Sequence, residues 1–211
     1  AGEAVEKFCE EFKIPFGETQ AGKSACQSGN PYCLGGIGVT GTYASNIIGK
    51  DADVVISIGS RMSDFTTSSK HLFQNEDVQF VSINNCRFHA YKMDAAKAVG
   101  DAKVTVEALT KKLRARGYVS AYNGEIEEAK KVWDKEMVRL AGIEYTGDDF
   151  EPIIKARDPR TIPEYVKLTN GKITQTAALA AINRTIDKDA TIITAGGSLP
   201  SCMQRIWTTD K

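Results

Sequence analysis

The sequence predicts an α/β protein built on a parallel, Rossmann-like sheet with flanking helices. Two apolar runs, at 53–58 and 78–84, show little alternation between polar and apolar side chains. Strands of that kind are covered on both faces, as in parallel sheets. Helical patterns separate these runs, and a parallel pair of strands needs a crossover of about that length.

The first half of the chain alternates helix and strand signals. Apolar residues recur at helical spacing between Ala4 and Phe12, and a short strand is expected near 14–17. Residues 20–38 are rich in Gly, Ser, Asn and Pro, which predicts a loop. Further helices are expected at 43–48 and from about 102 to 114, so that residues 1–117 form one Rossmann-like domain.

The second half reads as a helix, a linker and a new α/β unit. A helix over 123–142 carries one apolar stripe that includes Trp133. Residues 143–171 contain three prolines without periodicity, so 118–171 is interpreted as a helix and linker. At 172–211 we expect a helix (174–186), a strand (190–194), a glycine turn and another helix start. Because the chain opens on a helix and stops early in this unit, we expect the first sheet strand to be absent and the second unit to be incomplete.

Composition excludes several classes of protein. The 211 residues carry 27 Lys plus Arg against 27 Asp plus Glu, which gives no basic excess for nucleic acid. No apolar run approaches the roughly 20 residues that cross a bilayer, and no signal peptide is recognised. The five cysteines lack C-x-x-C spacing, which favours reduced thiols in a cytoplasmic protein. With two histidines in the chain, a His-rich metal centre is not expected.

Two turns in the first half are candidate ligand sites. Gly36, Gly38 and Gly41 have the spacing of a dinucleotide fingerprint, but the residues before them predict a loop where the fingerprint needs a strand. A tight packing turn is the favoured interpretation. Arg61 follows a strand end, where it either clamps a phosphate or carboxylate or pairs with Asp64.

The turn after the expected strand 190–194 is the third candidate. Backbone amides of Gly197 and Ser198 could bind phosphate oxygens at the start of a helix, although a plain strand-to-helix turn looks the same. Asn84, Asn85 and His89 follow another strand end, where a lone histidine is more often structural. No Ser-His-Asp, paired-carboxylate or metal-ligand arrangement is found, so no catalytic or metal-binding residue is assigned.

Longer stretches resemble a known family. The runs LGGIGVTGT at 34–42 and DADVVISIGSRMSDF at 51–65 are similar, in order and spacing, to the central domain of thiamine-diphosphate enzymes of the acetolactate synthase type. The segment 175–200, which ends in TAGGSLP, resembles the start of that family's diphosphate-binding domain. GETQAGKS at 17–24, DFTTSS at 64–69 and GSLP at 197–200 with Trp207 look most like the branch that opens a cyclic dione in myo-inositol catabolism.

The resemblance implies a cofactor, a substrate and a partial active site. It implies thiamine diphosphate with Mg²⁺, and C–C bond hydrolysis of trihydroxycyclohexane-1,2-dione to 5-deoxyglucuronate. It places Gly196, Gly197, Ser198 and Leu199 near the diphosphate. The Glu that activates the cofactor and the Gly-Asp-Gly motif that holds Mg²⁺ are expected outside these residues, so the chain alone should be inactive. A homo-oligomer, dimer or tetramer, is expected.

Two alternatives remain open. One is another enzyme of the family, of the acetolactate synthase or glyoxylate carboligase type. The other is a non-catalytic nucleotide-binding α/β module. Related synthases hold FAD or a nucleotide near turns like those at Gly36, Gly38, Gly41 and Arg61, and whether this chain keeps such a ligand is left undecided.

Overall fold

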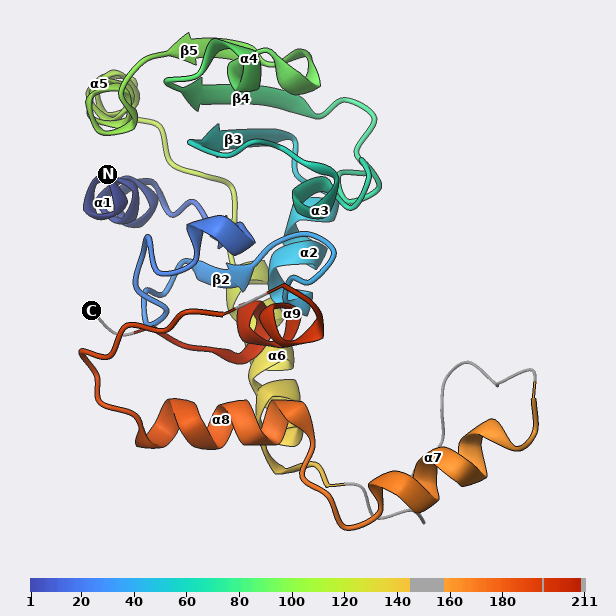
Figure 1. The fold of residues 1–211 in the computed structure, drawn as a ribbon. Helices are drawn as coiled ribbons and strands as arrows, with labels where there is room; N and C mark the ends of the chain where they lie inside the picture. The colour runs from blue at the N-terminus through green and yellow to red at the C-terminus, as the bar shows by residue number, and fades with distance from the viewer. Residues whose placement is uncertain (145–157, 195, 210–211) are drawn as a thin grey trace.

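A computed structural model describes residues 1–144, 158–194 and 196–209 (Figure 1). Most of its regular elements fall in the first 142 residues. The elements in chain order are α1 (Gly2–Phe12), β1 (Phe16–Glu18), the 3₁₀ turn η1 (Gln20–Gly22), β2 (Cys33–Gly36), α2 (Tyr43–Lys50), β3 (Val54–Ile58), α3 (Asp64–Thr67), β4 (Gln79–Asn84), α4 (Arg87–Ala90), η2 (Lys92–Asp94), β5 (Ala96–Val99), α5 (Ala102–Ala115), α6 (Glu125–Gly142), α7 (Thr161–Thr169), α8 (Gln175–Thr185) and α9 (Ser198–Ile206).

The α/β class and the parallel strands are confirmed. β3, β4 and β5 form a three-stranded parallel sheet in which Val54 pairs with Gln79 and Val81 with Ala96. The two apolar runs form β3 and β4 as expected. β5 was not predicted, because its sequence AKAV lacks the apolar run of a central strand and it lies at the sheet's edge.

The prediction of a single sheet and of a loop throughout 20–38 is wrong. β1 and β2 pair in parallel as a separate two-stranded sheet, and β2 lies within the expected loop. The short strand expected near 14–17 begins at Phe16. β2 has the sequence CLGG, whose glycines have low strand propensity, so its extended form depends on pairing with β1.

One edge of β1 and one edge of β3 are unpaired in the part of the chain described. The N–H of Gln79 bonds to the Asp53 carbonyl and that of Gly59 to the Ile83 carbonyl, so odd-numbered residues of β3 face β4. The backbone groups of Val54, Ile56 and Ile58 therefore point to the opposite edge. An open edge accepts another strand. That a strand from elsewhere completes the sheet stays a prediction.

Three apolar clusters hold the elements together. The largest joins α1 and α5 to the three-stranded sheet through Phe8, Phe12, Ile83 and Val106. A second packs α2 and β2 on α6, which places the predicted Trp133 stripe in a core. A third joins α6, α8 and α9 around Leu179, Met203, Ile206 and Trp207. Figure 1 shows α6 running down the molecule between the sheets and α8.

Two predictions for the second half are corrected. Residues 161–169 form a helix, α7, inside the expected linker. Pro163 lies in its first turn, where a missing N–H costs no intrahelical bond. The expected strand 190–194 is not formed; Ile193 is 92% exposed, and no described strand lies beside it to pair with. Residues 145–157 of the expected linker lie outside the described residues.

The helices predicted at 123–142 and 174–186 are confirmed as α6 and α8. α8 begins at a Thr174 cap, whose hydroxyl accepts the Ala177 N–H. Among the helices described, none has the length and apolar character to span a membrane.

Candidate functional site

The turn before α9 is an open, glycine-based helix start. Gly197 is the N-cap residue, with φ of 114°, and no side chain caps the first turn. A Cβ built on Gly197 would meet nothing within 4 Å. Ser198 and Leu199 are exposed, and no side-chain cap covers the first N–H groups of this nine-residue helix. Uncapped N–H groups and the positive end of the helix dipole favour an anion such as a diphosphate.

The glycine-rich turn 36–41 has a different environment. A strand, β2, does precede it, contrary to the expectation, and α2 follows, so it has the strand–turn–helix context of a dinucleotide fingerprint. Its glycines, however, lie against protein atoms. A Cβ on Gly38 would stand 2.0 Å from the Phe65 carbonyl oxygen, and one on Gly41 would stand 2.6 Å from the Gly36 carbonyl oxygen. The space that a phosphate would need beside these glycines is filled, which supports the packing-turn interpretation.

The other strand-end residues are structural or exposed. Asn84 ties two strand ends together: its Nδ2 donates to the Ser60 carbonyl at 3.0 Å, and its Oδ1 accepts the Cys86 N–H at 2.9 Å. Arg61 is exposed, and no ion pair joins it to Asp64 in the described part of the chain. His89 stacks edge-on against Phe88, and its buried Nδ1 has no hydrogen-bond partner. None of them lies in a formed ligand site.

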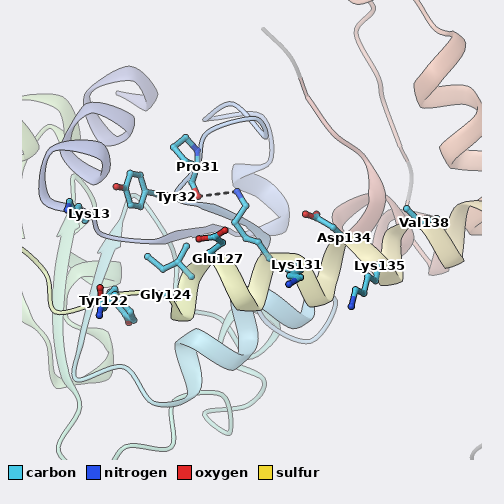
Figure 2. A pocket seen from close by; sticks show the side chains of 13 residues that line it. Lys13, Pro31, Tyr32, Tyr122, Gly124, Glu127, Lys131, Asp134, Lys135 and Val138 are labelled. Atoms are coloured by element: carbon cyan, nitrogen blue, oxygen red, sulfur yellow. Dashed lines mark hydrogen bonds between the residues drawn. The ribbon is translucent and has the colours of Figure 1, made fainter.

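A hollow beside α6 contains none of the predicted cofactor residues. It measures about 850 Å³ and lies between α6 and the loop that carries Pro31 and Tyr32 (Figure 2). The Lys130 ammonium on its wall donates to the Pro31 carbonyl at 3.1 Å and to the Cys33 carbonyl at 3.0 Å. This lysine holds α6 against the β2 segment. We assign the hollow no role in cofactor binding.

Two titratable side chains, Glu18 and Lys23, lie in the β1–β2 segment near α9. Glu18 is buried, and its Oε1 accepts the Cys26 N–H at 3.1 Å. Burial raises the pKa of the Glu18 carboxyl, although the Cys26 N–H and the Lys23 ammonium oppose the shift. Burial lowers the pKa of Lys23, and Glu18 opposes that shift. Burial therefore disfavours the charged form of both side chains, and the charge of each partly offsets that effect on the other.

The raised pKa of Glu18 predicts a pH dependence of stability. The folded chain holds the proton more tightly than the unfolded chain, so this contribution is complete below the ordinary pKa of 4.5 and is lost as pH rises through the folded pKa. Wild-type stability should therefore fall relative to that of Glu18→Gln as the pH rises from 4.5 toward neutrality. Urea unfolding across that range measures it. A constant difference between the two proteins would contradict the assignment.

The cysteines are free thiols in the structure. Cys9, Cys26 and Cys33 are buried, and burial raises the pKa of the Cys9 thiol to about 12. A thiol with that pKa is a poor nucleophile at neutral pH. Within the described ranges, no group of three or more His, Cys, Asp or Glu side chains is arranged to hold a metal ion.

Comparison with known proteins gives the family. Residues 1–109 match the family described as thiamine pyrophosphate enzyme, central domain. The chain belongs to this family. The family implies thiamine diphosphate as the cofactor, and its central domain accounts for the parallel strands and flanking helices of the structure.

Curated relatives are similar over the whole chain. It is 55% identical over 210 residues to a 3D-(3,5/4)-trihydroxycyclohexane-1,2-dione hydrolase of Clostridium botulinum (strain Alaska E43 / Type E3), covering 100% of this chain and 32% of the relative. A hydrolase of the same name from Clostridium perfringens (strain 13 / Type A) is 55% identical, with 33% of its length covered. That of Bacillus thuringiensis (strain Al Hakam) is 50% identical over 211 residues, with 33% covered. The chain thus spans about a third of these relatives.

Sequence reasoning missed Gln204, a polar residue that is 3% exposed. It lies between Met203 and Arg205 in α9, facing the β1–β2 segment rather than the apolar cluster with α8. A glutamine flanking the apolar residues of a short helix was the available signal. Its partners, Thr40 and two backbone carbonyls far away in sequence, carry no recognisable motif.

Proposed function

We propose that this chain is part of a thiamine-diphosphate-dependent hydrolase that opens 3D-trihydroxycyclohexane-1,2-dione to 5-deoxyglucuronate. The observation that carries the proposal is the similarity over the entire chain to proteins named as that hydrolase. Membership of the family supplies the cofactor. The exposed, uncapped turn at Gly197 supports a diphosphate contact there.

The residues proposed to contact the cofactor are Gly196, Gly197, Ser198 and Leu199. Backbone N–H groups of the first turn of α9 would hold diphosphate oxygens, with the Ser198 hydroxyl as an added donor. Thiamine diphosphate, when bound, supplies the carbanion chemistry of C–C cleavage. The chain's part is to bind and orient the diphosphate. The activating Glu and the Mg²⁺ motif are proposed to lie outside these 211 residues.

The substrate is tested with the full-length protein. It should convert the cyclic dione to the acyclic acid, with turnover that depends on added thiamine diphosphate and Mg²⁺, followed by NMR of the product. Pyruvate and glyoxylate serve as alternative substrates. Formation of acetolactate or of a glyoxylate condensation product, without dione opening, would favour a synthase or carboligase instead.

The 211-residue chain alone should not turn over the dione, even with thiamine diphosphate and Mg²⁺ present. We expect no product above the uncatalysed background in the same NMR assay, because the groups that activate the cofactor are proposed to lie elsewhere. Turnover at the rate of the full-length protein would contradict this placement. Tight nucleotide binding without any thiamine dependence would instead favour the non-catalytic module.

A cytoplasmic homo-oligomer, dimer or tetramer, is also proposed. The free thiols support the reducing compartment. The open edges of β1 and β3 support association, because an unpaired strand edge pairs readily with another chain. Light scattering of the full-length protein measures its oligomeric state.

A further inference from the structure

Gln204 joins the helix of the candidate cofactor turn to the central domain. α9 lies beside β2 (Figure 1). The Gln204 side-chain oxygen accepts a hydrogen bond from the Thr40 hydroxyl. Its Nε2 donates to the Glu18 carbonyl at 3.3 Å and to the Ile37 carbonyl at 3.2 Å. One buried amide thus contacts the ends of both β1 and β2.

Other contacts at this junction are weaker or involve only the backbone of α9. The Lys23 ammonium donates to the Gln204 carbonyl at 3.4 Å, and an Arg205 guanidinium nitrogen donates to the Val39 carbonyl at 3.5 Å. The glycine-rich turn also fits the Gln204 side chain closely: a Cβ on Gly36 would stand 2.5 Å from its Cγ. Gln204 is therefore the most specific polar contact between α9 and the turn 36–41.

α9 connects the Gln204 contact to the candidate cofactor turn. Gln204 is six residues after Ser198, which is about 9 Å along a helix. An adjacent face of α9 packs on α8 and α6 through Met203, Ile206 and Trp207. Apolar packing of this kind holds the helices together but is not directional. Three hydrogen bonds to fixed backbone and hydroxyl groups, in contrast, set the rotation of α9 about its axis and its position along that axis.

We propose that Gln204 is a positioning residue for thiamine diphosphate: it fixes α9 against the ends of β1 and β2 and thereby sets the direction of the N–H groups at Gly197–Leu199. The inference rests on the proposed function, because it takes the turn to be a diphosphate contact. It gives the glycine-rich turn of the central domain a role without any nucleotide. That role is to provide the surface against which the cofactor-binding helix is held.

The test uses Gln204→Leu in the full-length protein. Leucine keeps most of the volume and removes all three hydrogen bonds. We expect the KM for thiamine diphosphate to rise about tenfold, equivalent to about 1.4 kcal/mol, while kcat at saturating cofactor stays within about twofold. Hydrogen exchange, read by mass spectrometry, should accelerate in 198–206 without a comparable change in β3 and β4. A merely structural role would lower the active fraction, and hence kcat, instead of producing this split.

Thr40→Val is the second variant, because it removes one hydroxyl and leaves α9 unaltered. It should raise the same KM about threefold. Gln27→Leu, an exposed glutamine in the neighbouring loop, is the matched control and should change neither KM nor exchange. An unchanged cofactor KM in Thr40→Val and in folded Gln204→Leu would overturn the positioning role.

Failure of this inference and failure of the proposed function are distinguished by Gly197→Val. If that variant weakens cofactor binding and the Gln204 and Thr40 variants do not, the assignment of the turn to the cofactor holds and the positioning role of Gln204 is wrong. If none of the three weakens binding, the turn is not a cofactor contact and both proposals fail.

Discussion

Replacing Gly197 with valine in the full-length protein should weaken thiamine diphosphate binding about five- to hundredfold, or about 1–3 kcal/mol. The cause is backbone conformation rather than a clash, because a Cβ at this position meets nothing within 4 Å. With φ of 114°, Gly197 occupies a region that a β-branched residue does not adopt without strain. The turn would relax to another conformation, and the N–H groups of Ser198 and Leu199 would lose their alignment. Isothermal titration with the cofactor measures the effect.

Gly117→Val is the matched control for backbone strain. Gly117 also has a positive φ, of 64°, and open space around its Cβ position, but it follows α5 and has no proposed cofactor contact. It should leave cofactor affinity unchanged. Equal losses of affinity in the two variants would mean that Gly197 acts through general stability, which would contradict its assignment to the cofactor turn.

Gly38→Ala should lower the free energy of unfolding by about 3–5 kcal/mol, because the new side chain would cause both backbone strain and a steric clash. The new Cβ would stand 2.0 Å from the Phe65 carbonyl oxygen and 2.9 Å from the Thr66 Cα, which are backbone atoms that cannot rotate away. Gly38 also has φ of 101°. The contact belongs to a tight junction, because the Val39 N–H donates to that same Phe65 carbonyl at 2.9 Å. Urea unfolding measures the loss.

Gly29→Ala is the control for the Gly38 variant. Its Cβ would meet nothing within 4 Å and its φ is not in the left-handed region, so stability should change by less than about 0.5 kcal/mol. If Gly38→Ala were equally mild while nucleotide binding disappeared, the turn 36–41 would be a ligand site and the packing interpretation would be wrong.

Local patterns in the sequence predicted the elements whose state depends on local residues. The apolar runs became β3 and β4, and the amphipathic stripe with Trp133 became α6. The apolar, β-branched run at 190–194 shows the limit. Its composition favours a strand, but a strand needs a hydrogen-bonding neighbour, and the described residues supply none.

β2 and the role of Gln204 were not predicted from the sequence, because both depend on residues that are distant along the chain. Cys33–Gly36 is extended because β1 offers it a partner, whereas its glycines alone favour a loop. The turn at Gly197 could be located from its glycines, because a backbone position with positive φ favours glycine. The helix contact that holds this turn could not, because Gln204 bonds to Glu18, Ile37 and Thr40, more than 160 positions away.

The most direct test of the central claim is a crystal structure of the full-length protein with thiamine diphosphate and Mg²⁺ bound. The claim is that the turn at Gly196–Leu199 contacts the cofactor's diphosphate. We predict diphosphate oxygens within hydrogen-bonding distance, about 2.7–3.2 Å, of backbone nitrogens in the first turn of α9. A diphosphate bound elsewhere, with this turn facing solvent or another part of the protein, would contradict the account.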